Sequence, residues 1–502
     1  MFNLDPQSDL EESDINKGLT YLLFDGISSQ SMSSLASGAF IISFAILLGA
    51  TNLMVGIIAA IPFLTNIAQL IAIWIIESTH KRKIVSVVSS FISRMSLILI
   101  ALIPIFFDGF SITALLIFIG IMGIFASISS AAFNSWMREL IPKNIRGRYF
   151  AKRVRISIAV GSVLSIIAAM YVDGVITIYD TNIILKYSSI FVVAFVFGLM
   201  GIIFLSLVPE PKMKDNEHFN IKNIAKPFKD KRFKRLIMFI FVWSFACSLV
   251  TPFFVVYMLI RLGLPLSFVI GVTALSQIIT VLLLPIWGNL IDKFGIKPVM
   301  RLGAIFYLIA IALWPYTTLP ESYILTIPIL LIIYSLMGFA AGGITLSTTI
   351  FVYKLSPEKG YVPYITANGV TISIAAGIAP LFGGAITDII SKMRFSITFN
   401  WVDSSHPLTI FLTDFQGLDF LFIMGFFIGL YSLYLLKNVF EEDAAADNIV
   451  RYELFYTIRR YIRTQFLHLP SLISKNGNLQ FSLHSFIKTY NLSTTASKRS
   501  KV

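Results

Sequence analysis

Charged residues are scarce in this chain of 502 residues, where they make up 13% of the sequence. Soluble domains carry about 25%. A single cysteine, Cys247, excludes an internal disulfide framework. There is no glycine-rich P-loop, no prenyltransferase-type aspartate pair and no G-x-S-x-G nucleophile motif. The five histidines fall in predicted loops or in the tail, so we expect no metal site in a span. We therefore expect no cofactor and no enzymatic activity.

Apolar residues fill the chain instead, at 56% hydrophobic with a mean hydropathy of +0.80. A membrane-spanning helix needs about 20 predominantly apolar residues, and helices satisfy their own backbone hydrogen bonds in lipid. The apolar runs are too long, and alternate too little, for a β-barrel. The sequence therefore predicts an all-α polytopic membrane protein with twelve transmembrane helices. Their expected ranges are 19–48, 52–77, 84–106, 111–138, 154–178, 186–208, 236–262, 266–291, 299–317, 323–353, 361–389 and 418–437.

The basic residues orient these helices. Of the 40 lysines and arginines, 35 fall at the two termini and in the loops on the same side as them. Because such an excess marks the cytoplasmic side, we expect both termini in the cytoplasm. The net charge of +13 then matches an anionic inner leaflet, so nucleic acid is not an expected partner. The acidic N-terminus lacks the basic segment of a signal peptide, so we expect the first helix to stay as an anchor.

The chain also contains an internal repeat. One ungapped shift of the sequence against itself places Glu77 on Asp292, Arg82 on Lys297, Pro142 on Pro357, Ala168-Ala169 on Gly383-Gly384 and Asp173 on Asp388. Each pair occupies an equivalent place in the predicted topology. We therefore expect two pseudo-symmetric six-helix halves, the build of many secondary transporters. The expected parts are an acidic N-terminus (1–18), a first half (19–208), a basic linker (209–235), a second half (236–437) and a basic tail (438–502).

A loop motif adds a family resemblance. After the eighth helix the chain reads Gly288-Asn-Leu-Ile-Asp292-Lys293-Phe-Gly295-Ile-Lys297. This resembles the G-x-L-x-D-(R/K)-x-G signature of the major facilitator superfamily. The first half departs from it, with Ile73, Glu77 and His80 in place of Gly, Asp and Gly. The stretch Trp136–Phe150 is similar to one found in poorly characterised prokaryotic members. The resemblance implies a monomer in the cell membrane, most simply the bacterial cytoplasmic membrane.

The same resemblance suggests a cytoplasmic latch. Asp292 would meet the positive end of the fifth helix and nearby arginines, and Glu77 the start of the eleventh helix. Such contacts exist only while the cytoplasmic side is closed, so they would bias the transport cycle. The alternative is that these charges only orient the loops. The residues of this expected latch are Glu77, Arg82, Arg138, Arg148, Gly288, Asp292, Gly295 and Lys297.

Ionisable groups inside membrane spans are costly and are candidates for function. Asp25 lies about 12 Å into the first helix and Arg94 about 15 Å into the third, at about 1.5 Å a residue. Gln69 reaches a similar depth in the second helix. A pair of Asp25 and Arg94 that forms and breaks would couple proton uptake to transport; the alternative is a static ion pair. Gln277 and Asn368 are further candidates for contact with solute, although an interhelical hydrogen bond would also explain each.

These observations predict a secondary active transporter of a small organic solute, with the proton as the expected coupling ion and alternating access as the mechanism. The alternative is a non-transporting sensor or scaffold on the same fold. In that case the tail (438–502) and the loop at 390–417 would carry the interaction. Within the tail, apolar positions from Leu454 to Ile462 share one helical face opposite arginines, a pattern that suits a helix on the membrane surface. A solvated helix without a partner explains it equally well.

Overall fold

The structure is a computed structural model that describes residues 6–7, 11–107, 109–176, 182–213, 226–318, 325–357, 362–401, 408–439 and 441. The chain divides into two units, Met1–Ala445 and Ala446–Val502. All of the described residues belong to the first unit. The expected surface helix of the tail therefore lies outside the described residues.

Helices dominate the described part of the chain, and twelve helical spans are long and apolar enough to cross a membrane, as the sequence predicts. The first group comprises α1 (Glu12–Ala36), α2 (Ala39–Leu47), α3 (Asn52–Thr65), the 3₁₀ turn η1 (Asn66–Ala68), α4 (Gln69–Thr79), α5 (Arg82–Phe106), α6 (Ser111–Leu140), α7 (Lys143–Val172) and α8 (Ile183–Leu207). The second group comprises α9 (Lys226–Lys229), α10 (Lys231–Val256), the π-helical turn η3 (Tyr257–Arg261), α11 (Leu266–Phe294), α12 (Ile296–Leu313), the 3₁₀ turn η4 (Trp314–Thr318), α13 (Thr326–Leu355), α14 (Val362–Ile390) and α15 (Leu418–Lys437).

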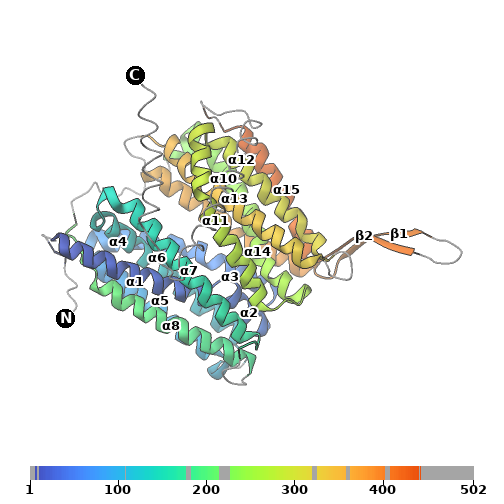
Figure 1. The fold of residues 1–502 in the computed structure, drawn as a ribbon, viewed down its shortest axis with the longest axis horizontal. Helices are drawn as coiled ribbons and strands as arrows, with labels where there is room; N and C mark the ends of the chain where they lie inside the picture. The colour runs from blue at the N-terminus through green and yellow to red at the C-terminus, as the bar shows by residue number, and fades with distance from the viewer. Residues whose placement is uncertain are drawn as a thin grey trace, which may run out of the picture. The chain divides into compact units, whose positions relative to one another are not determined.

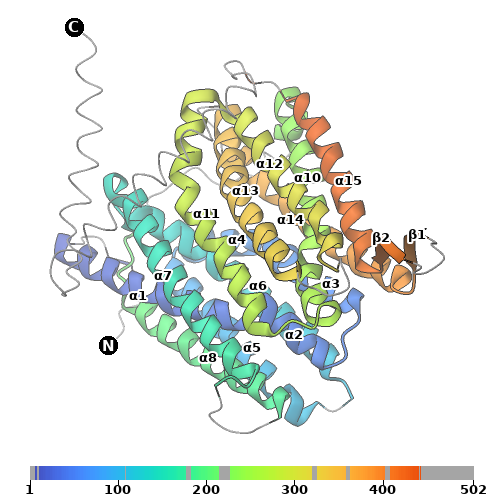
Figure 2. The same ribbon diagram turned by 45° about the vertical axis from the view of Figure 1, so that its right-hand side comes forward.

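The two groups form two halves with the same internal packing. In the N-terminal half (α1–α8), α1 packs against α7 and α8, and α5 packs against α6 and α8. In the C-terminal half (α9–α15), α10 packs against α14 and α15, and α12 packs against α13 and α15. Counted as spans, these are the same pairs shifted by six helices. The prediction of two pseudo-symmetric six-helix halves is confirmed, and the two groups separate in Figures 1 and 2.

A β-hairpin marks one end of the helices. The segment between α14 and α15, expected to be a loop, contains β1 (Arg394–Trp401) and β2 (Leu408–Gln416), paired antiparallel with an irregularity between Ile397 and Thr398. Figure 1 shows this hairpin projecting from the ends of its two helices. We call this end of the helices the hairpin end, and the opposite end, with the loops around Arg82, Arg146 and Lys297, the basic end.

Helix boundaries differ from the predicted ranges chiefly at the basic end. The first span begins at Glu12 rather than residue 19, and α7 begins at Lys143 rather than residue 154. The cause is that a helix continues past its apolar part, whereas hydropathy detects only that part. The first span also breaks between α1 and α2 at Gly38, whose φ of +58° suits glycine.

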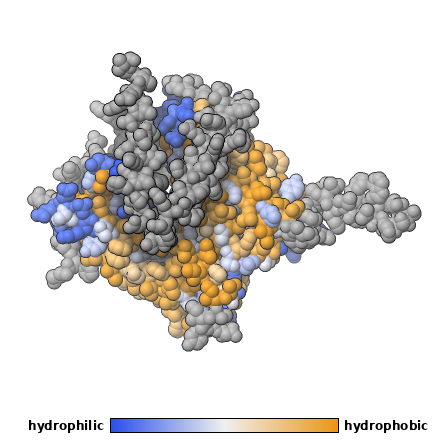
Figure 3. Space-filling view, viewed as in Figure 1, coloured by the Kyte–Doolittle hydropathy of each residue, from blue (hydrophilic) through white to orange (hydrophobic). Residues whose placement is uncertain are grey.

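The exposed faces of the spans are apolar. Trp74, Phe106 and Ile389 expose 70%, 69% and 72% of their area, and Figure 3 shows hydrophobic residues gathered over much of the visible face. Large exposed apolar surfaces are rare on soluble monomers. Such a surface suits contact with lipid.

The repeat extends to the turns at the basic end. Gly295, between α11 and α12, has a φ of +91°, and His80, its counterpart in the first half, has a φ of +53°. A left-handed residue after a helix directs the chain into the next helix. Both turns therefore use a positive φ, but His80 is left-handed helical, with a ψ of 20°, whereas Gly295 has a ψ of 171°, a combination that suits glycine.

Candidate functional site

A cluster of charged side chains lies inside the N-terminal half, around Asp25 of α1. The Asp25 side chain is buried, and its Oδ2 lies 2.9 Å from Nη2 of Arg153 on α7. Its Oδ1 accepts a 3.1 Å hydrogen bond from the Ser29 hydroxyl and lies 4.0 Å from Nη2 of Arg94 on α5. The structure thus brings Asp25 and Arg94 together and adds Arg153. We call Asp25, Ser29, Arg94 and Arg153 the charged cluster.

Both arginines are held by further acceptors. Arg94 donates to the Ser29 hydroxyl at 2.9 Å and to the Gly198 carbonyl of α8. Arg153 donates through Nε to the Leu22 carbonyl at 3.0 Å and lies over the Phe133 ring of α6. The cluster therefore ties α1 to α5, α7 and α8. Because it holds two guanidinium groups and one carboxylate, it carries one excess positive charge when Asp25 is ionised.

Glycines lie where the side chains of Arg94 and Arg153 pass between the helices. A Cβ on Gly26 would fall within contact of the Arg153 Nε, and within 2.9 Å of its Cγ. A Cβ on Gly198 would lie 3.1 Å from Cδ of Arg94, and one on Gly201 would lie 3.1 Å from its Nη1. The absence of a side chain at these positions lets the arginines pass between helices to reach Asp25.

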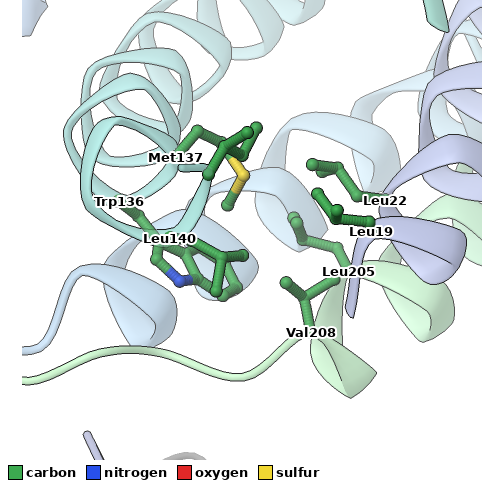
Figure 4. Close-up of a cluster of buried hydrophobic side chains, with 8 residues drawn as sticks. Leu19, Leu22, Trp136, Met137, Leu140, Leu205 and Val208 are labelled. Carbon is green, nitrogen blue, oxygen red and sulfur yellow. The ribbon is translucent and has the colours of Figure 1, made fainter. Parts of the chain in front are cut away.

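An apolar cluster packs around the first half of α1 and includes Leu22, three residues before Asp25 (Figure 4). Its buried members come from α1, α6 and α8, and from the residues that follow α6 and α8: Leu19, Leu22, Trp136, Met137, Leu140, Ile141, Leu205 and Val208. The Trp136 indole donates to the Pro209 carbonyl at 3.0 Å, and the Tyr149 hydroxyl donates to the Leu19 carbonyl at 2.6 Å. The Tyr149 bond and the packing of Leu19 and Leu22 hold the start of α1 against its own half, and the Trp136 bond joins α6 to the segment after α8.

A second, uncharged cluster joins the two halves near the middle of the spans. The Asn66 side chain donates to Ser373 of α14 at 3.3 Å and accepts from Ser127 of α6 at 3.4 Å and from Gln69 at 3.4 Å. Asn66 begins η1, which interrupts the second span four residues after Pro62. A 3₁₀ stretch within a helix often marks a hinge. We call Asn66, Gln69, Ser127 and Ser373 the central polar cluster.

Within the described residues, Gln277 and Asn368, the two candidate solute contacts in the C-terminal half, make no hydrogen bond with the central polar cluster. Gln277 of α11 is exposed. The Asn368 Oδ1 of α14 is buried without a hydrogen-bond partner, which leaves a polar atom for a ligand or for water. An apolar groove of about 260 Å³ lies between α9, α10 and α14, lined by residues that include Phe228, Phe241 and Ile374.

At the basic end, Arg82 is fully buried within its own half. Its side chain lies 2.8 Å from Glu139 and 3.3 Å from Glu210, and it donates to the Pro211 carbonyl at 2.7 Å. Glu210 also accepts from the backbone N–H groups of Arg82 and Lys83, at 2.8 and 3.2 Å. A carboxylate that follows the last helix of this half thus caps the N-terminus of α5.

The C-terminal half repeats this device. The carboxylate of Glu441 accepts from the backbone N–H groups of Ile296 and Lys297, and from the Lys354 ammonium at 2.9 Å. Lys297 donates to the carbonyls of Lys437 and Val439. Arg82 and Lys297, which the repeat pairs, both hold the segment that follows the last helix of their half.

The remaining residues of the expected cytoplasmic latch occupy the same end. Asp292 and Arg148 are exposed, and Asp292 makes no hydrogen bond or ion pair within the described residues. Glu77 is half-buried, Arg138 is exposed with its carbonyl bound by Arg146, and Gly288 packs loosely against Leu346. A latch between Asp292 and the other half remains a prediction.

Sequence reasoning missed several of these partners. It placed Arg153 among the loop charges, and it did not single out Ser29, Glu139, Glu210 or Glu441. Arg153 gives no local signal of burial, since it lies among Arg148, Lys152 and Arg155 at the start of the apolar run predicted from residue 154. In the described residues, no group of three His, Cys, Asp or Glu side chains could hold a metal ion.

Comparison with known proteins gives the family. The model of the Major Facilitator Superfamily matches residues 26–333 and 262–402. A curated efflux pump, dotC of Dothistroma septosporum, is 26% identical over 177 residues, which is 32% of this chain and 29% of that protein. An MFS-type transporter of Aspergillus terreus is 30% identical over 131 residues, 26% of this chain and 22% of that protein. The chain thus matches less than a third of these relatives' length.

Solved structures share the fold at low identity. The nucleoside transporter NupG aligns with a TM-score of 0.61 and 13% identity over 86% of this chain and 100% of that one. A D-xylose–proton symporter aligns with a TM-score of 0.58 and 15% identity, covering 86% of this chain and 98% of that one. The family model covers most of the spans, and the two halves have the paired packing described above. The chain is therefore a multi-pass membrane protein that belongs to the Major Facilitator Superfamily of transporters.

Proposed function

We propose that this protein is a secondary active transporter that moves a small organic solute by alternating access, coupled to protons through Asp25. The observation that carries the proposal is the charged cluster: a buried carboxylate within a membrane span, shared by Arg153 and Arg94. Charged groups at this depth are costly and usually functional. The xylose–proton symporter of the same fold supports the choice of proton as the coupling ion.

The cluster suits a protonation switch because its ion pairs come from different helices. While Asp25 is ionised, Arg153 and Arg94 hold α1 against α7 and α5. Protonation would cancel the attraction and leave two guanidinium groups to repel each other, which would loosen α1 from α7. Since α7 packs against α11 of the other half, a shift of α7 would reach the interface between the halves.

The central polar cluster is the proposed solute site. It lies between the halves near mid-depth, where substrates of such folds bind. Its amide and hydroxyl groups are neutral and able both to donate and to accept hydrogen bonds. Gln277, and the unpartnered Oδ1 of Asn368, are further candidate contacts. We propose that the basic end faces the cytoplasm, that both termini lie there, and that the protein acts as a monomer in the cell membrane.

The test is a ligand screen followed by one substitution. Purified protein would be melted at pH 5.5 and 7.5 with sugars, nucleosides, amino acids, peptides, organic anions and cationic dyes. A ligand at one hundred times its dissociation constant stabilises a protein by about 2.7 kcal/mol. Transport of each hit would then be measured in vesicles with an imposed proton gradient. We expect Asp25→Asn to abolish the dependence of transport on that gradient while leaving ligand binding measurable.

Glu12→Gln is the matched control, because Glu12 is an exposed carboxylate on the same helix. It should transport at the rate of the unmodified protein. Full gradient dependence in Asp25→Asn would refute the coupling role. No hit with any ligand class, together with no transport, would favour a sensor or scaffold over a transporter.

A further inference from the structure

Two aspartates at the hairpin end each bridge the two halves in the same manner. Asp388, at the end of α14, accepts from the backbone N–H groups of Asn52 and Leu53 at 3.1 and 3.0 Å. Asp173, just after α7, accepts from the backbone N–H groups of Leu266 and Ser267 at 3.0 and 2.7 Å. Each carboxylate therefore caps the first turn of a helix in the opposite half. We propose that Asp173 and Asp388 are paired latches that hold the hairpin end closed during alternating access.

The internal repeat makes this a twofold-related pair. Asp173 and Asp388 are counterparts in the same register that pairs Arg82 with Lys297. Asp388 ends the eleventh span and caps the second, whereas Asp173 ends the fifth and caps the eighth. The fifth span corresponds to the eleventh and the eighth to the second, six spans apart in each case. The two contacts are therefore the same contact with the roles of the two halves exchanged. One swing of the halves would therefore break both latches together.

The chemistry favours a strong but reversible contact. The first N–H groups of a helix have no partner within it, and the helix dipole adds a positive charge there. A carboxylate that binds two such groups satisfies both with charge-assisted hydrogen bonds. Asp388 adds a third, from the Asn52 side-chain amide at 2.9 Å. Water can take over these groups once the halves separate, because Asp388 is exposed and Asp173 is only half-buried.

Close backbone packing reinforces the Asp388 latch. A Cβ on Gly384, one turn before Asp388, would lie 2.7 Å from the Leu53 Cα and in contact with the Asn52 carbonyl. A Cβ on Gly56 would touch the Pro380 carbonyl. The two helices therefore meet backbone to backbone where the carboxylate caps α3. A contact this close requires the hairpin end to be closed.

The proposal rests on alternating access, so its test follows both ends of the molecule. All variants would carry Cys247→Ala. Spin labels at Leu47→Cys and Ile389→Cys, exposed at the hairpin end on opposite halves, report its opening. Labels at Asn144→Cys and Asn289→Cys, exposed toward the basic end of α7 and α11, report the other side. Pulsed electron spin resonance would measure both distances in nanodiscs.

We expect Asp388→Ala and Asp173→Ala each to raise the ratio of long to short distances at the hairpin end about fivefold, because a lost cap shifts one shared equilibrium. The double variant should raise it by more than tenfold. The basic-end distance should shorten in the same samples. Thr51→Ala is the matched control: Thr51 caps α3 from its own half, by accepting from the Met54 N–H, so its loss should leave both distance distributions unchanged.

The outcomes separate the two proposals. Unchanged hairpin-end distances in the double variant would overturn the latch. A longer hairpin-end distance with an unchanged basic-end distance would also overturn it, since the aspartates would then only pin local helix ends. The proposal of alternating access is tested separately in the unmodified protein. It would be overturned if neither added ligand nor a change of pH lengthened the distance at one end while shortening the distance at the other.

Discussion

Asp25 is reachable by two arginines only because three neighbouring positions carry no side chain. Arg153 passes Gly26, and Arg94 passes Gly198 and Gly201. A protein interior is packed too densely to absorb extra atoms freely. The charged cluster is therefore specified as much by its glycines as by its charges, and this gives a test that leaves every charged residue in place.

Gly26→Ala should break the ion pair between Arg153 and Asp25. The added Cβ falls on the Arg153 side chain, so we expect a loss of about 1–3 kcal/mol, typical of overpacking. Gly120→Ala is the control, since a Cβ there meets nothing within 4 Å; in a helix it should stabilise by about 0.5–1 kcal/mol. Thermal unfolding in detergent measures both. Equal midpoints for the two variants would show that Arg153 moves aside without cost.

In an Asp25→Asn background the cost of Gly26→Ala should shrink, because the pair it disrupts is already weakened. Residues in contact show such non-additivity, whereas distant ones do not. A cost that stays the same would mean that the added methyl group acts through packing alone.

At the scale of elements, each half closes its basic end with a carboxylate on a helix N-terminus. Glu210 caps α5 and Glu441 caps α12. The register of the repeat would place the counterpart of Glu210 earlier in the chain than Glu441. The second half is longer here because the hairpin of β1 and β2 is inserted before its last helix. The two caps are therefore equivalent in the fold, although the ungapped register of the repeat does not align Glu210 with Glu441.

The cap at Glu441 should depend on pH. Burial tends to raise the pKa of its carboxyl, but hydrogen bonds from Ile296, Lys297 and Lys354 outweigh burial and hold the pKa below its ordinary value of 4.5. A carboxyl with a lowered pKa stabilises the fold above its ordinary pKa, and that contribution is lost as the pH falls through the folded-state value. Glu441→Gln should thus cost about 1 kcal/mol at pH 7, as for a lost cap.

The difference between Glu441→Gln and the unmodified protein should then disappear as the pH falls well below 4.5. Unfolding midpoints between pH 7 and pH 3 test this. Asp292→Asn is the control, since Asp292 is an exposed carboxylate near the same end, and its unfolding midpoint at pH 7 should match that of the unmodified protein. A difference in unfolding midpoint that persists at pH 3 would show that the packing of Glu441, rather than its charge, stabilises the fold.

The elements themselves were largely predictable from the sequence, since long apolar runs permit little except helices in lipid. Asp25 and Arg94 were predictable because charge is rare in such runs. Arg153 was not, because it lies near a helix start where basic residues are common. The hairpin was missed since residues 390–417 contain no apolar run. Asp173 and Asp388 were recognised as a repeat pair, yet their partners are set by how the halves meet, which no local pattern records.

For the whole molecule, the contact between α3 and α14 decides how far the hairpin end can close. Gly56, Gly377 and Gly384 lie along this contact, and a Cβ on any of them would fall within 2.7 Å of atoms across it. Small residues allow helices in membranes to approach closely. If the closed state depends on this approach, a single methyl group should shift the balance between the open and closed forms.

Gly384→Ala should open the hairpin end without removing any hydrogen bond. Its Cβ would meet the backbone of Asn52 and Leu53, which cannot rotate away as a side chain can, so α3 and α14 must separate. Overpacking of about 1–3 kcal/mol corresponds to a shift of roughly tenfold in the ratio of long to short distances between labels at Leu47 and Ile389. Gly369→Ala lies on the same helix with nothing within 4 Å of its Cβ, so its ratio should match that of the unmodified protein. If Gly384→Ala gives the same distance ratio as Gly369→Ala, the contact between α3 and α14 can accommodate an added methyl group. The aspartates rather than the close packing would then hold the halves together.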